Sequence, residues 1–197
     1  MRSRPWPRSN FEKMPSSGFA QILTRWRVRA GSLGIILVVL LAKPTMLSLL
    51  VGGGVCFLGI GLRTWAAGHL RKEKALAISG PYQYCRNPLY LGNLILGIGA
   101  TIGASSWWVA TIFVAYFSLF YPVIIRREMN RMKELFPDKY EAYKKFVPLF
   151  CPRLKPQARS QDAAFSWHIY KKNREYRALI AAIIFWGILL GKMLLLP

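Results

Sequence analysis

The chain alternates between long apolar stretches and short polar or strongly basic segments. Five apolar stretches stand out, at residues 30–42, 46–62, 88–103, 107–125 and 178–196. A helix needs about 20 residues to cross a bilayer core, so each stretch is a candidate span, the first being the shortest. Turn residues at 43–45 and 104–106 join the first four stretches into two helical hairpins. The pattern predicts an all-α, multi-pass transmembrane helical bundle of about five spans.

The distribution of charge supports this prediction and sets an orientation. All but Lys43 and Lys192 of the 28 Lys and Arg residues lie in segments 1–29, 63–86 and 126–177, and the formal net charge is +20. Residues 87–125 carry no charge at all. Cytoplasmic segments of membrane proteins are enriched in Lys and Arg. We therefore expect a multi-pass protein of a bacterial inner membrane, with its N-terminus in the cytoplasm and its C-terminus outside.

Composition narrows the possible partners and processing. The chain is 53% hydrophobic and 14% aromatic, which disfavours both a disordered basic tail and a soluble nucleic-acid-binding protein. We expect the lipid bilayer to be a partner and nucleic acid not to be. No small-residue cleavage site follows the first apolar stretch, so we expect no cleaved signal peptide.

Glycine is frequent in the second and third apolar stretches. The residues are Gly52, Gly53, Gly54, Gly59, Gly61, Gly92, Gly97, Gly99 and Gly103. Small residues let membrane helices approach closely, and this is the interpretation we favour. The alternative is space for a ligand against bare backbone.

The inventory of reactive side chains excludes several kinds of chemistry. Two His and three scattered Cys, with no C-x-x-C pair, disfavour a protein-built metal site. No G-x-S-x-G motif is present, and no acidic residue lies inside an apolar stretch, which disfavours a serine hydrolase and an ion-coupled transporter. Chemistry supplied by a bound cofactor remains.

A dense polar cluster, residues 79–90, ends where the third apolar stretch begins. It allows two interpretations. In the structural one, Asn87 is the N-cap of the helix, Pro88 takes its first position, and the tyrosines lie at the membrane interface. In the functional one, the positive end of the helix receives a cofactor carboxylate, and tyrosines pack against the ligand.

A second cluster, residues 126–148, follows the fourth stretch. Its spacing predicts two short amphipathic helices on the cytoplasmic side, separated at Pro137. Glu128 is expected to be the only acidic residue near the end of a span. It could bind a ligand, or it could form a surface ion pair with Arg131 or Lys133.

In this order the two clusters resemble the integral-membrane methyltransferases, which include isoprenylcysteine carboxyl methyltransferase, its bacterial relatives and phospholipid N-methyltransferases. The resemblance covers roughly residues 52–154. It rests on Gly80-Pro81-Tyr82, Arg86-Asn87-Pro88-x-Tyr90-x-Gly92, Glu128, Phe136-Pro137-x-x-Tyr140-x-x-Tyr143, Val147-Pro148 and Pro152, preceded by Leu62-Arg63-x-Trp65-Ala66-x-Gly68-His69-Leu70. Three positions depart from the family pattern: Asn87 replaces the commoner His, Met129 replaces a second Glu, and Pro137 replaces Gly.

The resemblance implies that S-adenosylmethionine binds on the cytoplasmic side and that a lipophilic acceptor enters from the bilayer. It carries cofactor-binding roles to Tyr82, Arg86, Asn87, Pro88, Tyr90 and Glu128, and catalytic roles to Arg86 and Glu128. We expect carboxyl O-methylation of an isoprenylcysteine-like acceptor. The alternatives are N-methylation of a phospholipid or other lipid, a sterol-reductase-like fold with a nicotinamide cofactor, and a scaffold without activity that binds anionic lipid.

These observations together predict the domain organisation. We expect a basic cytoplasmic segment at 1–29, a methyltransferase core at 30–155, a cytoplasmic linker at 156–177 and an extra transmembrane helix at 178–197. The last two segments lie outside the resemblance.

Overall fold

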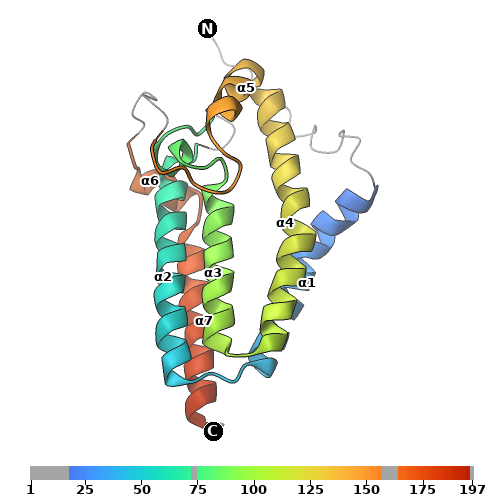
Figure 1. Ribbon diagram of the computed structural model, residues 1–197, viewed down its shortest axis with the longest axis vertical. Helices are drawn as coiled ribbons and strands as arrows, with labels where there is room; N and C mark the ends of the chain where they lie inside the picture. Colours follow the sequence, from blue (N-terminus) through green and yellow to red (C-terminus); the bar gives the residue numbers. More distant parts are fainter. Residues whose placement is uncertain (1–17, 72–74, 157–163, 196–197) are drawn as a thin grey trace.

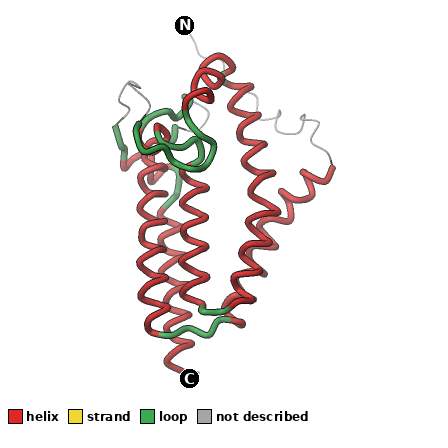
Figure 2. Tube along the Cα trace, viewed as in Figure 1, coloured by secondary structure: helices red, strands yellow, loops and turns green. Residues whose placement is uncertain are grey.

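The computed structural model describes residues 18–71, 75–156 and 164–195. Within them the protein is all-α. Its elements are α1 (Gly18–Leu41), α2 (Met46–His69), the 3-10 helix η2 (Gly80–Gln83), α3 (Pro88–Ala104), α4 (Trp107–Leu135), α5 (Pro137–Phe146), α6 (Trp167–Lys172) and α7 (Tyr176–Leu195). Figure 2 shows the long helices running roughly parallel, with most of the irregular backbone gathered at one end.

All five predicted apolar stretches form helices. Three of these helices, α2, α4 and α7, are long and apolar enough to cross a membrane. The apolar part of α1, Arg29–Leu41, and the 17-residue α3 are shorter. At 1.5 Å per residue α3 is about 25 Å long, slightly less than the hydrocarbon core of a bilayer. The prediction of a helical membrane bundle is therefore confirmed in part, as three long candidate spans and two shorter apolar helices.

Large apolar side chains cover the outer faces of these helices. Leu47 and Phe57 on α2 are 72% and 77% exposed, and Trp107 at the start of α4 is 90% exposed. Apolar surface of this extent is unfavourable in water and is expected of helices that face lipid. The exposed faces therefore agree with a membrane environment.

The helices α2, α3 and α7 lie side by side, while α1 packs along α4 (Figure 1). The turn between α1 and α2 lies next to the turn between α3 and α4, and the amide of Lys43 donates to the carbonyl of Ala104 at 2.8 Å. The connection between α2 and α3 and the segment from α5 to α6 lie at the opposite end (Figure 1). Both predicted turns are thus present, and α3 packs on α4, whereas α1 packs chiefly on α4 and α2 chiefly on α3 rather than on each other.

Glycine brings α2 and α3 into backbone contact. A Cβ placed on Gly52 would lie 2.6 Å from both the backbone nitrogen of Gly103 and the carbonyl oxygen of Gly99. A Cβ on Gly99 would lie 2.7 Å from the oxygen of Gly52. These distances are too short for any side chain, so the favoured interpretation, close helix packing, is confirmed for these glycines.

Two boundaries differ from the prediction. The helix α2 continues past residue 62 to His69, and α4 continues past residue 125 to Leu135. The expected separate amphipathic helix at the start of cluster 126–148 is therefore wrong, because those residues are the last turns of α4. The second expected helix is confirmed as α5, which begins at Pro137 and lies across the end of the bundle (Figure 1).

Candidate functional site

The cluster at residues 79–90 folds into a compact turn that leads into α3. Gly80 has φ +57°, and a Cβ there would lie 2.7 Å from the ring of the buried His69, so only glycine fits. Asn87 occupies the N-cap position and Pro88 the first turn of α3. The structural interpretation is therefore right about the position of Asn87 but wrong about its side chain, which makes no capping hydrogen bond.

The side chain of Asn87 instead fixes the segment that follows α5. Its Nδ2 donates to the carbonyl oxygen of Leu149 at 3.0 Å. Two backbone bonds support the same contact: the amide of Arg86 donates to Pro148 at 2.9 Å, and the amide of Arg153 donates to Tyr84 at 3.0 Å. These three bonds attach segment 148–153 to the start of α3.

Tyrosines join α5 to η2. The hydroxyl of Tyr143 donates to the carbonyl oxygen of Tyr82 at 2.6 Å. Burial raises the pKa of Tyr143 and of Tyr82 well above the usual value for a phenol, so both hydroxyls stay protonated at neutral pH. After burial, the largest cause of the raised pKa of Tyr82 is the negative charge of Glu128. The two sequence clusters, 79–90 and 126–148, therefore meet at this end of the bundle.

Arg86, in the first cluster, faces Tyr140 of the second, and some of its N–H donors have no acceptor among the described residues. Its Nη1 reaches the hydroxyl of Tyr140 at 3.4 Å, which is a long contact. Its Nε is buried and has no hydrogen-bond partner among the described residues. A buried guanidinium N–H without a partner is energetically unfavourable unless a ligand supplies an acceptor.

The ion pairs of α4 and α5 test the alternative role of Glu128. Arg131 pairs with Glu134 at 3.7 Å, and Lys133 pairs with Glu141 at 3.5 Å. Both cations that were expected to neutralise Glu128 thus have other acidic partners. Glu128 takes part in none of the ion pairs found among the described residues. The expected ion pair of Glu128 with Arg131 or Lys133 is not formed.

A cavity of about 370 Å³ lies deeper in the bundle. Residues from α2, α3 and α4 and one residue before α7 line it: Arg63, Leu89, Tyr90, Asn93, Tyr116, Tyr121, Ile124 and Glu175. Of the six residues given cofactor-binding roles, only Tyr90 is among them. Glu128 follows Ile124 by four positions and Tyr121 by seven, so all three lie on one side of α4. Glu128 therefore lies one helical turn beyond the cavity lining, and its charge acts on Tyr82.

Glu175 and Arg63 are the charged residues of the cavity, and the sequence analysis missed their pairing. Nη2 of Arg63 donates to Glu175, and Nη1 donates to the side-chain oxygen of Asn93. The expectation that Glu128 is the only acidic residue near the end of a span is wrong, because Glu175 directly precedes α7. The position of Glu175 just before the fifth apolar stretch is visible in the sequence. Its pairing with Arg63 depends on tertiary packing and is not.

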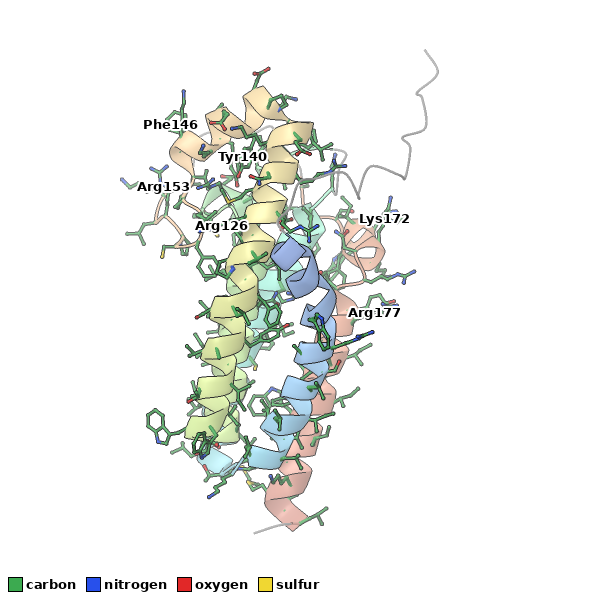
Figure 3. The ribbon with its side chains drawn as sticks, turned by 90° about the vertical axis from the view of Figure 1, so that its right-hand side faces the viewer. Arg126, Tyr140, Phe146, Arg153, Lys172 and Arg177 are labelled. Carbon is green, nitrogen blue, oxygen red and sulfur yellow. The ribbon has the colours of Figure 1, made fainter. Side chains whose placement is uncertain are left out.

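Basic and aromatic side chains surround the same end of the molecule. Figure 3 shows Arg126, Tyr140 and Arg153 gathered at the end of α4 and around α5, with Lys172 at about the height of Arg126 on the other side of the molecule. Arg126 and Lys172 are exposed. This end carries the charged surface, as expected for a face in contact with water and lipid head groups.

Cys85 is a buried residue of the cluster at 79–90. Burial raises the pKa of Cys85 to about 11, which makes its thiol a poor nucleophile at neutral pH. Within the described residues no group of three or more His, Cys, Asp or Glu side chains could hold a metal ion.

Comparison with known proteins finds a family model and two relatives that match part of the chain. Residues 47–139 match a family model described as phospholipid methyltransferase. The cobalt-zinc-cadmium resistance protein CzcN of Cupriavidus metallidurans is 40% identical over 105 residues, which is 51% of this chain and 47% of that protein. The nickel-cobalt-cadmium resistance protein NccN of Alcaligenes xylosoxydans xylosoxydans is 36% identical over 103 residues, with the same coverage. The chain thus matches about half the length of these relatives. No solved structure matches it significantly.

Proposed function

We propose that the chain is a membrane methyltransferase that uses S-adenosylmethionine, because residues 47–139 match the family model of the phospholipid methyltransferases. The family match carries this proposal. It agrees with the resemblance of the motifs around Arg86 and Glu128. The names of the relatives attribute metal resistance to those proteins and specify no reaction, so the proposed chemistry does not come from them.

The residues around Arg86 fit the cofactor. S-adenosylmethionine carries a carboxylate, an ammonium group, a sulfonium and ribose hydroxyls. The Nε of Arg86, which has no hydrogen-bond partner among the described residues, can donate to the carboxylate. Glu128 can accept from the ammonium or from a ribose hydroxyl, and its charge lies close enough to Tyr82 to raise the pKa of that residue. Asn87 holds segment 148–153 in place through Leu149. Pro88 fixes the start of α3, and Tyr90 faces the cavity.

The chemistry requires little of the protein beyond positioning. A sulfonium is an intrinsically good methyl donor. The residues of this chain must hold the acceptor atom in line with the methyl group and exclude water. A carboxylate acceptor is already ionised at neutral pH, whereas an amine acceptor must be delivered unprotonated. Within this proposal the acceptor is a lipophilic molecule that enters the cavity from the bilayer, either an isoprenylcysteine-like carboxylate or a phospholipid amine.

Cofactor binding is tested by calorimetric titration of the purified chain with S-adenosylhomocysteine. We expect binding by the wild type and about 10- to 100-fold weaker binding by Glu128→Gln, which loses a charge-assisted hydrogen bond. Arg86→Ala should also weaken binding, and Arg86→Lys should restore it only in part, because an ammonium lacks the planar fork. Glu134→Gln, which changes an exposed ion pair on the same helix, is the matched control and should bind normally.

The class of acceptor is tested on the product. Membranes that contain the chain are incubated with methyl-labelled S-adenosylmethionine, and the lipid extract is treated with alkali. Labelled methanol is released from a carboxyl methyl ester, whereas an N-methyl group keeps its label. A wild-type chain that binds anionic lipid but no S-adenosylhomocysteine would contradict the methyltransferase proposal and favour the scaffold.

A further inference from the structure

The cavity is completed by a segment outside the family match. Glu175 and Asn173 lie between α6 and α7, well beyond residue 139. Nδ2 of Asn173 donates to the carbonyl oxygens of Ala67 and Leu70, at 3.0 and 2.9 Å, which fastens this segment to the end of α2. Arg174 adopts a left-handed backbone conformation with φ +58°. The chain therefore adopts an uncommon backbone conformation at the turn that leads to Glu175.

Arg63 has more hydrogen-bond donors than the protein uses. Its side chain is 15% exposed, and that of Glu175 is 13% exposed. Nη1 is taken by Asn93 and Nη2 by Glu175, while Nε is buried without a partner among the described residues. The N–H of Nε and one N–H of Nη2 point along the same edge of a guanidinium group. Nη2 has a second N–H on its other edge, so Glu175 occupies at most one of the two donors on the Nε–Nη2 edge.

This half-used edge defines the ligand chemistry. A guanidinium edge binds a carboxylate or phosphate through two parallel hydrogen bonds, and such pairs are stronger than single ones. A buried N–H without an acceptor favours any ligand that supplies one. The cavity of about 370 Å³ is far larger than the roughly 30 Å³ that a water molecule occupies, so a head group has room. Leu89 and Ile124 offer apolar contact for the adjoining part of a lipid tail.

We propose that this cavity binds the acidic head group, carboxylate or phosphate, of a membrane amphiphile on Arg63. The ligand takes the Nε–Nη2 edge and displaces Glu175 from Nη2. This inference deepens the proposed function, since it identifies where the methyl acceptor is held and what chemistry its head group has. Asn93 keeps its bond to Nη1 and holds the guanidinium in orientation.

Glu175 then acts as a specificity residue. Its carboxylate occupies the site in the absence of ligand and repels an incoming anion at short range. Removing the charge of Glu175 should strengthen the binding of anionic amphiphiles and leave neutral ones unaffected. If the ion pair were purely structural, the opposite is expected. Loss of Glu175 would then loosen α7 and weaken the binding of every ligand.

The test uses the full chain in micelles of a neutral glycoside detergent, which carries neither carboxylate nor phosphate, and three probes with alkyl tails of similar length. These are tetradecanoate, its methyl ester and tetradecyl phosphate, each measured by equilibrium binding with and without S-adenosylhomocysteine. We expect both anions to bind and the ester to bind at least tenfold more weakly. Glu175→Gln should tighten the binding of the anions about three- to tenfold. Arg63→Lys should weaken it about tenfold or more, because an ammonium cannot make the paired contact. Glu134→Gln should change nothing.

The outcomes separate this inference from the methyltransferase proposal. Equal binding of tetradecanoate and its ester by the wild type would overturn the anion site, whatever the cofactor result. Unchanged or weaker anion binding by Glu175→Gln, with a normal melting temperature, would overturn the displacement of Glu175. Anion binding without any binding of S-adenosylhomocysteine would keep the anion site and refute the proposed function. A preference between the carboxylate and the phosphate probe identifies the head group. If Arg63→Lys is poorly folded, the comparison of tetradecanoate with its ester still tests the anion site, and Glu175→Gln still tests the displacement of Glu175.

Discussion

The contact between Tyr143 and Tyr82 offers a direct test of how the candidate site is held together. The hydroxyl of Tyr143 donates to the carbonyl oxygen of Tyr82 at 2.6 Å, across 61 positions of the chain. Changing Tyr143→Phe removes this bond and little else. The substitution therefore asks how strongly α5 is fastened to η2.

The expected cost follows from two contributions. A neutral hydrogen bond contributes about 0.5–1.5 kcal/mol net, and leaving a buried carbonyl unsatisfied costs about 1–3 kcal/mol. Tyr143 is half-buried, so water can reach part of the vacated space, and we expect a loss of about 1–2 kcal/mol. For a chain of this size the loss corresponds to a fall in melting temperature of about 2–8 °C. Because burial raises the pKa of Tyr143, the stabilisation should be fully present below about pH 10, the usual phenol value, and should fade only above it.

Thermal unfolding of the detergent-solubilised protein measures this effect between pH 6 and pH 9. Tyr176→Phe is the matched control, since Tyr176 is 40% exposed at the start of α7, and it should melt like the wild type. S-adenosylhomocysteine affinity should also fall in Tyr143→Phe, because η2 carries Tyr82. An unchanged melting temperature in Tyr143→Phe would refute the account of how α5 is attached.

Three further predictions concern packing, reactivity and topology. Gly52→Ala should destabilise the protein by about 2 kcal/mol or more, because its Cβ would lie 2.6 Å from backbone atoms of α3. Gly53→Ala is the control: its Cβ meets open space, so the change should be neutral or slightly stabilising. The melting temperatures of the two variants test this difference. Maleimide labelling at pH 7 should modify the exposed Cys151 and leave the buried Cys85 intact. Fast modification of Cys85 at pH 7 would contradict its burial and its raised pKa. A single cysteine at Ser105, in a cysteine-free chain, should react with an impermeant reagent from outside intact cells, and protection there would contradict the expected topology.

The sequence predicts the helices well because the membrane imposes the pattern. Apolar stretches without charge, such as 88–103 and 107–125, are recognised directly as candidate spans. The same pattern fails at the helix ends that run into the basic segments. Arg63 belongs to α2 and Arg126 to α4, yet both were assigned to connecting segments. Charge marks where the membrane ends, and a helix can continue beyond that point.

The candidate site was predictable only in part, for a similar reason. Arg86, Asn87 and Glu128 were recognised from local motifs, and the structure brings their two clusters together. The use of Asn87 to hold the Leu149 carbonyl, and the ion pair of Arg63 with Glu175, depend on residues 62 and 112 positions away. Neither contact leaves a local pattern in one sequence, so both required the folded chain.

The central claim is that this chain transfers a methyl group to a lipid-soluble acceptor. The most direct measurement incubates membranes containing the wild-type chain with methyl-labelled S-adenosylmethionine and counts the label in the organic extract. The account predicts label well above that of membranes without the chain, and its loss in Glu128→Gln when the variant is present in equal amount and melts normally. Equal label with and without the wild-type chain, over a range of bacterial lipid extracts, would contradict the claim.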